Sequence, residues 1–207
     1  LRTPLARLRL GIELDDAATR AGMVADIEEM DRIIGQFLDF ARDVPAGASE
    51  PIDVAAAVAT AVDRYRNAGH DVSHASAAPA LARIQPASVS RLVGNLVDNA
   101  LAYGAPPVEV STRDDGGEVV IEVADRGAGI ADADVERLKQ PFTRAGPARS
   151  REDGAAGAGL GLAIVERIAR LHGGRLDLLP REGGGTIARV TIARAGGAFT
   201  GAPRRPD

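Results

Sequence analysis

The stretch that constrains the fold most is residues 106–130, which read PPVEVSTRDDGGEVVIEVADRGAGI. Apolar and polar residues alternate on both sides of Asp-Asp-Gly-Gly, a pattern typical of two half-buried strands joined by a tight turn. Residues 174–193, GRLDLLPREGGGTIARVTIA, predict a second hairpin of the same kind. The two hairpins predict a sheet, and the apolar face of that sheet needs a second layer to cover it.

Helices are expected to supply this second layer. Helical periodicity or alanine-rich composition extends over residues 54–65, 86–104, 131–142 and 160–174, and short strands are expected at 71–76 and 81–84. Hydrophobic residues make up 45% of the chain but aromatic residues only 3%, which predicts a core of Ala, Val, Leu and Ile. The predicted fold class is α+β, a two-layer α/β sandwich in which helices cover one face of a mixed sheet.

A different pattern precedes this sandwich. Apolar residues spaced three and four apart form a heptad seam in the second of two predicted helices: Ile27, Met30, Ile34, Phe37 and Ala41. We predict a helical hairpin over residues 1–44, a linker over 45–51, the sandwich domain over 52–195 and a disordered tail over 196–207. Such a hairpin cannot bury a core alone. It either dimerises into a four-helix bundle, which we expect, or packs on its own downstream domain.

Composition argues against several classes of function. A net charge of −4 with no dense basic stripe argues against nucleic-acid binding. The chain has no cysteine, which excludes disulfides, thiolate zinc sites and cysteine nucleophiles and indicates a reducing, cytoplasmic compartment. The longest strongly apolar run, near residues 54–62, is about half as long as a membrane span requires.

Three groups of residues could carry chemistry. Asn95 and Asn99 project from one face of a predicted helix, where their amide oxygens would suit Mg²⁺; two exposed asparagines are the alternative. Asp125 ends a strand and could accept a hydrogen bond from the exocyclic amine of adenine, unless Asp-Arg-Gly-Ala-Gly is a simple turn. Glycines at 157, 159 and 161 precede a helix whose free N–H groups favour phosphate, unless they only make the loop flexible.

In this order, the three groups resemble the N, G1 and G2 boxes of the GHKL ATPase superfamily, most closely the catalytic domain of osmosensor-type sensor histidine kinases. Residues 140–145, QPFTRA, resemble the F box, and the GGGT ending at Thr186 resembles the last glycine box. The resemblance implies a Bergerat fold that binds ATP and Mg²⁺ beneath a lid over residues 144–158.

The resemblance also implies a role for each matching residue. Asn99 would be the principal Mg²⁺ ligand, Asn95 would assist at the metal or the phosphates, and Asp125 would recognise the adenine amine. The other expected ATP contacts are Gly127 and Gly129 at the base, Thr186 beside it, Gly157, Gly159, Leu160 and Gly161 at the phosphates, Phe142 as lid anchor, Tyr103 beside the nucleotide and Arg144 at a phosphate. Many relatives carry Lys or Arg where this chain has Ala102, so Arg144, Arg149 or Arg151 would have to meet part of the phosphate charge.

Asn95 separates two branches of the superfamily. In the gyrase and HSP90 branches, a Glu four residues before the metal-binding Asn activates water. An amide is a poor base. We therefore expect transfer of the γ-phosphoryl group to another residue rather than hydrolysis.

The opening residues, LRTPLARLRL, resemble the segment that follows the phosphoacceptor histidine in the H box of these kinases. The resemblance implies that the acceptor His and its acidic neighbour come just before Leu1. It also implies that Thr3 positions water for dephosphorylation of the response regulator. His70, His74 and His172 are expected to be surface or capping residues.

The expected function is that of the cytoplasmic part of a two-component sensor histidine kinase. Its partners would be ATP, a second copy of the hairpin and a response-regulator receiver domain, and a membrane-anchored sensor segment would lie upstream. Because the acceptor is expected before Leu1, the chain as given is not expected to phosphorylate itself. Alternatives are an acceptor-less dimeric ATP-binding signalling module and a GHKL serine kinase, against which the hairpin argues.

Overall fold

The computed structural model describes residues 50–76, 78–143 and 159–196, and the isolated positions 23, 24, 27, 30 and 35. The described residues therefore leave out all but these isolated positions of the predicted hairpin, most of the predicted linker and tail, and the loop over 145–158. Everything that follows concerns the sandwich domain.

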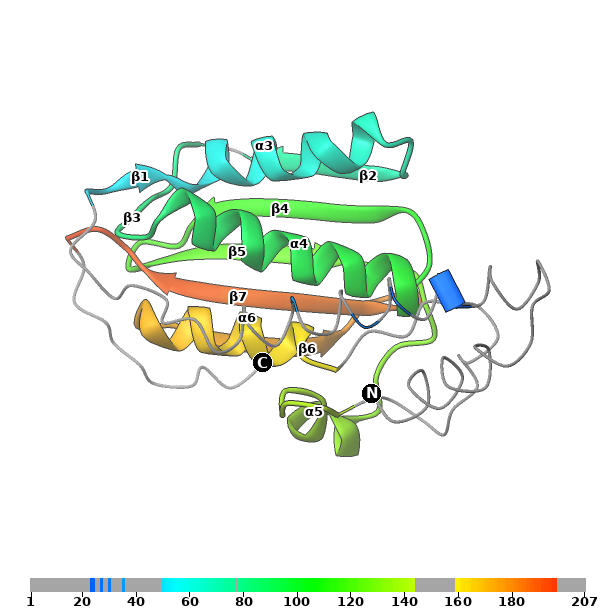
Figure 1. Cartoon of the computed structure of the whole chain (residues 1–207). Coiled ribbons are helices and arrows are strands. Elements are labelled where there is room, and N and C mark those ends of the chain that lie inside the picture. Colours follow the sequence, from blue (N-terminus) through cyan, green and yellow to red (C-terminus); the bar gives the residue numbers. More distant parts are fainter. Residues whose placement is uncertain are drawn as a thin grey trace.

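Five strands form one mixed sheet in the order β2-β4-β5-β7-β6 (Figure 1). The edge strand β2 runs parallel to β4, and all other neighbours are antiparallel. Both predicted hairpins are present, as β4–β5 and β6–β7. The strands are β2 (Val72–Ser76), β4 (Val108–Asp114), β5 (Glu118–Ala124), β6 (Arg175–Pro180) and β7 (Thr186–Ala193).

Three helices cover one face of this sheet, as Figure 1 shows: α3 (Val54–Asn67), α4 (Pro86–Tyr103) and α6 (Gly161–Leu171). The predicted α+β sandwich is thus confirmed. The helix expected over 131–142 is shorter, because α5 (Asp132–Leu138) ends before Pro141, whose ring cannot continue a helix.

The prediction of a strand over 81–84 was wrong in extent. Strand β3 (Leu81–Ala82) is only two residues long, and it pairs with β1 (Ile52–Asp53) in a separate small sheet. The Asp53 side chain links the start of α3 to this small sheet, since its Oδ1 accepts the N–H groups of Ala55 at 3.0 Å and Ala80 at 3.1 Å. One carboxylate thereby caps the helix and fixes the chain that enters it.

The core lies between the helices and the sheet, and its buried cluster consists of Ala, Val, Leu and Ile, as expected. Helix α4 has apolar residues three and four apart, so a single stripe packs inward: Val89, Leu92, Val93, Leu96 and Ala100. Helix α6 packs beside α4, and its Ile164 and Ile168 are buried in the same core cluster. This packing brings the first turn of α6 against the polar side of α4. Within the described ranges, no helix is long and apolar enough to cross a membrane.

Candidate nucleotide-binding site

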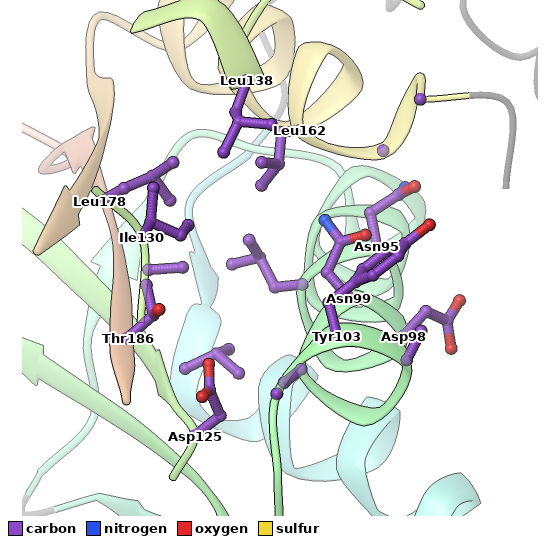
Figure 2. Close-up of a pocket in the computed structure, with 18 of the residues that line it drawn as sticks. Asn95, Asp98, Asn99, Tyr103, Asp125, Ile130, Leu138, Leu162, Leu178 and Thr186 are labelled. Carbon is purple, nitrogen blue, oxygen red and sulfur yellow. The ribbon is translucent and has the colours of Figure 1, made fainter. Parts of the chain in front are cut away.

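A cavity of about 470 Å³ opens between α4, α6, α5 and the ends of β5, β6 and β7 (Figure 2). Most of the described residues predicted to bind ATP lie on its wall: Asn95, Asn99, Tyr103, Asp125, Gly129, Gly159, Gly161 and Thr186. These residues come from segments up to about ninety positions apart in the chain, and the fold brings them to one cavity.

Asn95 and Asn99 face the first residue of α6. The Asn95 Nδ2 donates a 2.8 Å hydrogen bond to the Arg91 carbonyl, which leaves its Oδ1 available on the cavity side. A Cβ placed on Gly161 would lie 3.3 Å from Asn95 Oδ1 and 3.4 Å from both Oδ1 and Nδ2 of Asn99. Two amide oxygens and the N–H groups of a helix N-terminus therefore share one small space, where a cation and an anion could be held together.

Asp125 lies across the cavity from the asparagines, just after β5 (Figure 2). The residue is only 8% exposed. Its Oδ1 accepts the Gly127 N–H at 2.7 Å, and its backbone N–H donates to the Thr186 carbonyl at 3.0 Å. These contacts fix a carboxylate at the end of a strand, where it can accept a hydrogen bond from a ligand.

Two glycines at the site are required by their surroundings. Gly159 has φ +70°, and a Cβ on it would lie 2.7 Å from the Thr143 carbonyl oxygen. Gly104, directly after α4, has no room either, because a Cβ would come 2.5 Å from Asp125 Cγ. The sequence interpretation missed Gly104. The only available signal was a glycine at the end of the helix predicted over 86–104.

Three expected contacts take a different position. Leu160 is fully buried in the core rather than on the cavity wall. Gly127 holds Asp125 instead of lining the cavity. Phe142 has a side chain 63% exposed, and its link to the glycine segment is a backbone N–H that donates to the Gly159 carbonyl at 2.9 Å. Thr3, Arg144 and Gly157 lie outside the described residues.

The rest of the wall is largely apolar, and sequence reasoning did not predict it. Ile130, Leu138, Leu162 and Leu178 converge there from four different segments (Figure 2). An apolar slot beside a fixed carboxylate suits a flat heterocyclic base that carries one polar edge. In a single chain, these leucines and isoleucine look like ordinary core residues.

Asp98 also lies on the wall, and it contacts α3. Its Oδ1 is 2.7 Å from the Tyr65 hydroxyl, which also lies 3.2 Å from the Gly94 carbonyl. Burial, followed by the contact with Asp98, raises the pKa of Tyr65 well above its usual value. The phenol therefore stays protonated and donates, which holds α3 against the residues between Asn95 and Asn99.

The three histidines lie away from the cavity wall. His172 caps α6, with its Nδ1 2.8 Å from the Ile168 carbonyl, and His70 is exposed. His74 contacts the Thr112 hydroxyl at 3.2 Å; burial lowers its pKa, partly offset by Asp63. Within the described ranges, no cluster of three or more His, Cys, Asp or Glu side chains could hold a metal ion.

The α/β sandwich, with paired amides beside a helix N-terminus and a buried carboxylate beside an apolar slot, defines the chain as a nucleotide-binding domain. Residues 84–196 match the family model of histidine kinase-, DNA gyrase B- and HSP90-like ATPases. That match covers more than half of the chain, which therefore belongs to this family of ATP-binding domains.

Similar proteins indicate the branch. The chain is 35% identical over 179 residues to the sensor-like histidine kinase SenX3 of Mycolicibacterium smegmatis, covering 82% of this chain and 46% of that protein. It is 32% identical to the histidine-protein kinase/phosphatase MprB of Mycolicibacterium vanbaalenii, covering 90% of this chain and 42% of the relative. The solved histidine kinase domain of the Escherichia coli osmosensor EnvZ aligns with a TM-score of 0.56 at 30% identity, covering 77% of this chain and 98% of that domain.

The domain is thus an ATP-binding domain of the sensor histidine kinase type. The chain spans about half the length of the curated relatives it matches.

Proposed function

We propose that the chain binds Mg-ATP and transfers the γ-phosphoryl group to a histidine on the hairpin of a two-component sensor histidine kinase. The phosphoryl group would then pass to an aspartate of a response regulator. The observation that carries this proposal is that Asn95 and Asn99 face Gly161 at the start of α6, in a cavity that Asp125 also lines.

The donor set fits Mg²⁺. Amide oxygens are hard, neutral ligands, and Mg²⁺ combines one or two protein ligands with waters and phosphate oxygens. Asn99 would hold the ion and Asn95 would assist, since its Nδ2 is already bound to the Arg91 carbonyl and its Oδ1 remains available. When bound, the ion would neutralise charge on the phosphates, and the α6 N–H groups after Gly161 would bind phosphate oxygens.

The other end of the cavity fits adenine. The Asp125 carboxylate would accept a hydrogen bond from the 6-amino group, which guanine lacks at that position. Ile130 and Leu178 would pack on the base, with Thr186 beside it and Tyr103 near the nucleotide's outer side. Burying the base against apolar residues while pairing its amine satisfies both parts of the ligand.

Transfer is favoured over hydrolysis by the chemistry of the wall. Asn95 stands where the hydrolytic branches place a Glu, and an amide cannot take a proton from water. Asp98 is a carboxylate on the same helix, but its Oδ1 already accepts the Tyr65 hydroxyl at 2.7 Å. The rate would then come from positioning and charge neutralisation, with the acceptor supplied from outside the cavity.

Residues 52–195 would form the catalytic domain. The remaining parts of the proposal concern regions outside the described residues. The hairpin over 1–44 would dimerise, and the acceptor would lie just before Leu1. Thr3 would support a phosphatase activity, and the relative MprB is named a histidine-protein kinase/phosphatase. Arg144, Arg149 or Arg151 would supply the positive charge at the phosphates that many relatives place at the position of Ala102.

The experiment is phosphorylation with γ-labelled ATP and Mg²⁺ of a chain extended upstream of Leu1. We expect a label on the protein that is labile to acid and stable to base, as a phosphohistidine is. Asn99→Ala should lose this label while remaining folded. Release of free phosphate without labelled protein would contradict the proposal and favour a hydrolase. Mg-ATP binding without any labelling would favour an acceptor-less binding module.

A further inference from the structure

The turn between β6 and β7, residues 181–185, holds the main chain of Asp125. Arg181 Nη1 donates a 3.2 Å hydrogen bond to the Asp125 carbonyl oxygen. Its Nη2 forms an ion pair with Glu109 of β4, 72 positions earlier in the chain. The Arg181 side chain is only 10% exposed, so this is a nearly buried cation with two defined partners.

The same turn and the start of β7 contact Asp125 in two further ways. Directly after the turn, the carbonyl of Thr186, the first residue of β7, accepts the Asp125 backbone N–H at 3.0 Å. Gly185 passes so close that a Cβ on it would lie 2.0 Å from the Asp125 carbonyl oxygen. Because Gly185 has no side chain, space remains at the Asp125 carbonyl oxygen for the Arg181 guanidinium. Both polar groups of the Asp125 backbone are therefore satisfied, the carbonyl by the turn and the N–H by the first residue of β7.

Arg181 does not line the cavity, whereas Asp125 does. Glu109 lies opposite Ala124 in the β4–β5 register, so it is fixed beside Asp125 by the sheet itself. A guanidinium held by that carboxylate has little freedom, and it donates to a carbonyl in a fixed direction. Of the two hydrogen-bond partners of the Arg181 side chain, Asp125 lines the cavity and Glu109 does not, so we expect the side chain to act on a bound base through Asp125.

We propose that Arg181 is a positioning residue for base recognition, holding the Asp125 main chain so that its carboxylate stays directed at the 6-amino group of adenine. The proposal rests on the proposed function, in which Asp125 reads this amine. It predicts that Arg181 affects selectivity for the amine rather than nucleotide binding in general. Without the guanidinium, the Asp125 carbonyl loses its charged donor and the strand end becomes freer to move.

The test compares two ligands by calorimetry with Mg²⁺ present: ADP, and purine riboside 5′-diphosphate, which lacks the 6-amino group. Arg181→Met should weaken ADP binding roughly fivefold to tenfold, the equivalent of one hydrogen bond. Binding of the purine analogue should change less than about twofold. Arg189→Met is the matched control, since Arg189 pairs with Glu122 on another part of the sheet at 2.6 Å. It should alter neither affinity.

If Arg181→Met weakens the binding of both ligands equally, or weakens the binding of neither, the proposal is overturned. If Arg181→Met does not fold, judged by thermal unfolding, Glu109→Gln replaces it, because Glu109 is about half exposed and the turn stays intact. That variant should show a smaller loss that is again confined to ADP, and a loss shared by both ligands overturns the idea. A wild-type chain that binds neither nucleotide contradicts the proposed function itself, and one that binds both equally contradicts the role of Asp125.

Discussion

Replacing Gly161 by alanine should separate folding from nucleotide binding. Gly161 is the first residue of α6, and its backbone lies outside the positive-φ region, so alanine fits the conformation. A methyl there would lie 3.3 Å from Asn95 Oδ1 and 3.4 Å from Asn99 Oδ1. The 3.3 Å contact is short, so the Asn95 amide must retreat by a few tenths of an ångström, whereas the Asn99 amide stays at the lower edge of ordinary contact distance.

A displacement of this size should have little effect on folding but a large effect on metal binding. Mg²⁺ requires oxygen ligands at about 2.0–2.1 Å in nearly octahedral geometry, and the methyl also blocks the approach of phosphate to the helix N–H groups. We expect Mg-ATP to bind about tenfold more weakly, or roughly 1.4 kcal/mol. Stability should be unchanged or slightly higher, because alanine is favoured over glycine in a helix by at most about 1 kcal/mol.

Calorimetric titration with Mg-ATP and thermal unfolding of the same samples measure the two quantities. Gly94→Ala is the matched control on α4, one residue before Asn95. Its Cβ would be 3.6 Å from the Tyr65 hydroxyl oxygen, an ordinary contact. The control should raise the unfolding temperature and leave the affinity unchanged. If Gly161→Ala binds Mg-ATP as well as the wild type, the asparagines and the α6 N-terminus do not act together on the triphosphate.

Two other substitutions test the packing around the site and the open face of the sheet. Tyr65→Phe removes the hydroxyl that contacts Asp98 and Gly94. Urea unfolding should show that the free energy of unfolding falls by about 1 kcal/mol. An unchanged unfolding midpoint would mean that this contact does not stabilise the fold. Burial tends to raise the pKa of Glu122, but hydrogen bonds from Arg189 and Arg113 outweigh it, so the folded pKa lies below the unfolded value. The stabilisation is then present above the unfolded pKa and is lost as the pH falls through the folded pKa. Glu122→Gln should lower the free energy of unfolding by roughly 1 kcal/mol at pH 7 and by progressively less toward pH 3. A difference between variant and wild type that does not change with pH would contradict the ionic origin.

Local patterns in the sequence predicted much of the fold. Alternation on both sides of a glycine turn predicted the β4–β5 and β6–β7 hairpins, and the apolar stripe from Val89 to Ala100 predicted α4. The pairing of β1 with β3 was missed because each strand has only two residues, too few to show any periodicity. Nor could alternation alone show that β2 joins the sheet parallel to β4.

The site was predictable where a motif placed residues on one element, as with Asn95 and Asn99. It was not predictable where the contact is long-range. Gly104 meets Asp125 only through the packing of α4 on β5, and Arg181 reaches Glu109 across 72 positions. Leu160 stands between two glycines of the phosphate motif, yet its side chain belongs to the core. A motif identifies the backbone that approaches a ligand, whereas tertiary packing decides where each side chain points.

The most direct test of the central claim is the Mg²⁺ dependence of ATP binding, measured by calorimetry on the whole chain. The wild type should bind ATP more tightly with Mg²⁺ than with a chelator present. Asn99→Ala should lose that difference while retaining the metal-free affinity, because Asp125 and the apolar slot remain intact. An Asn99→Ala chain that keeps the full Mg²⁺ effect would show that the metal is held elsewhere, and the account of this site would be wrong.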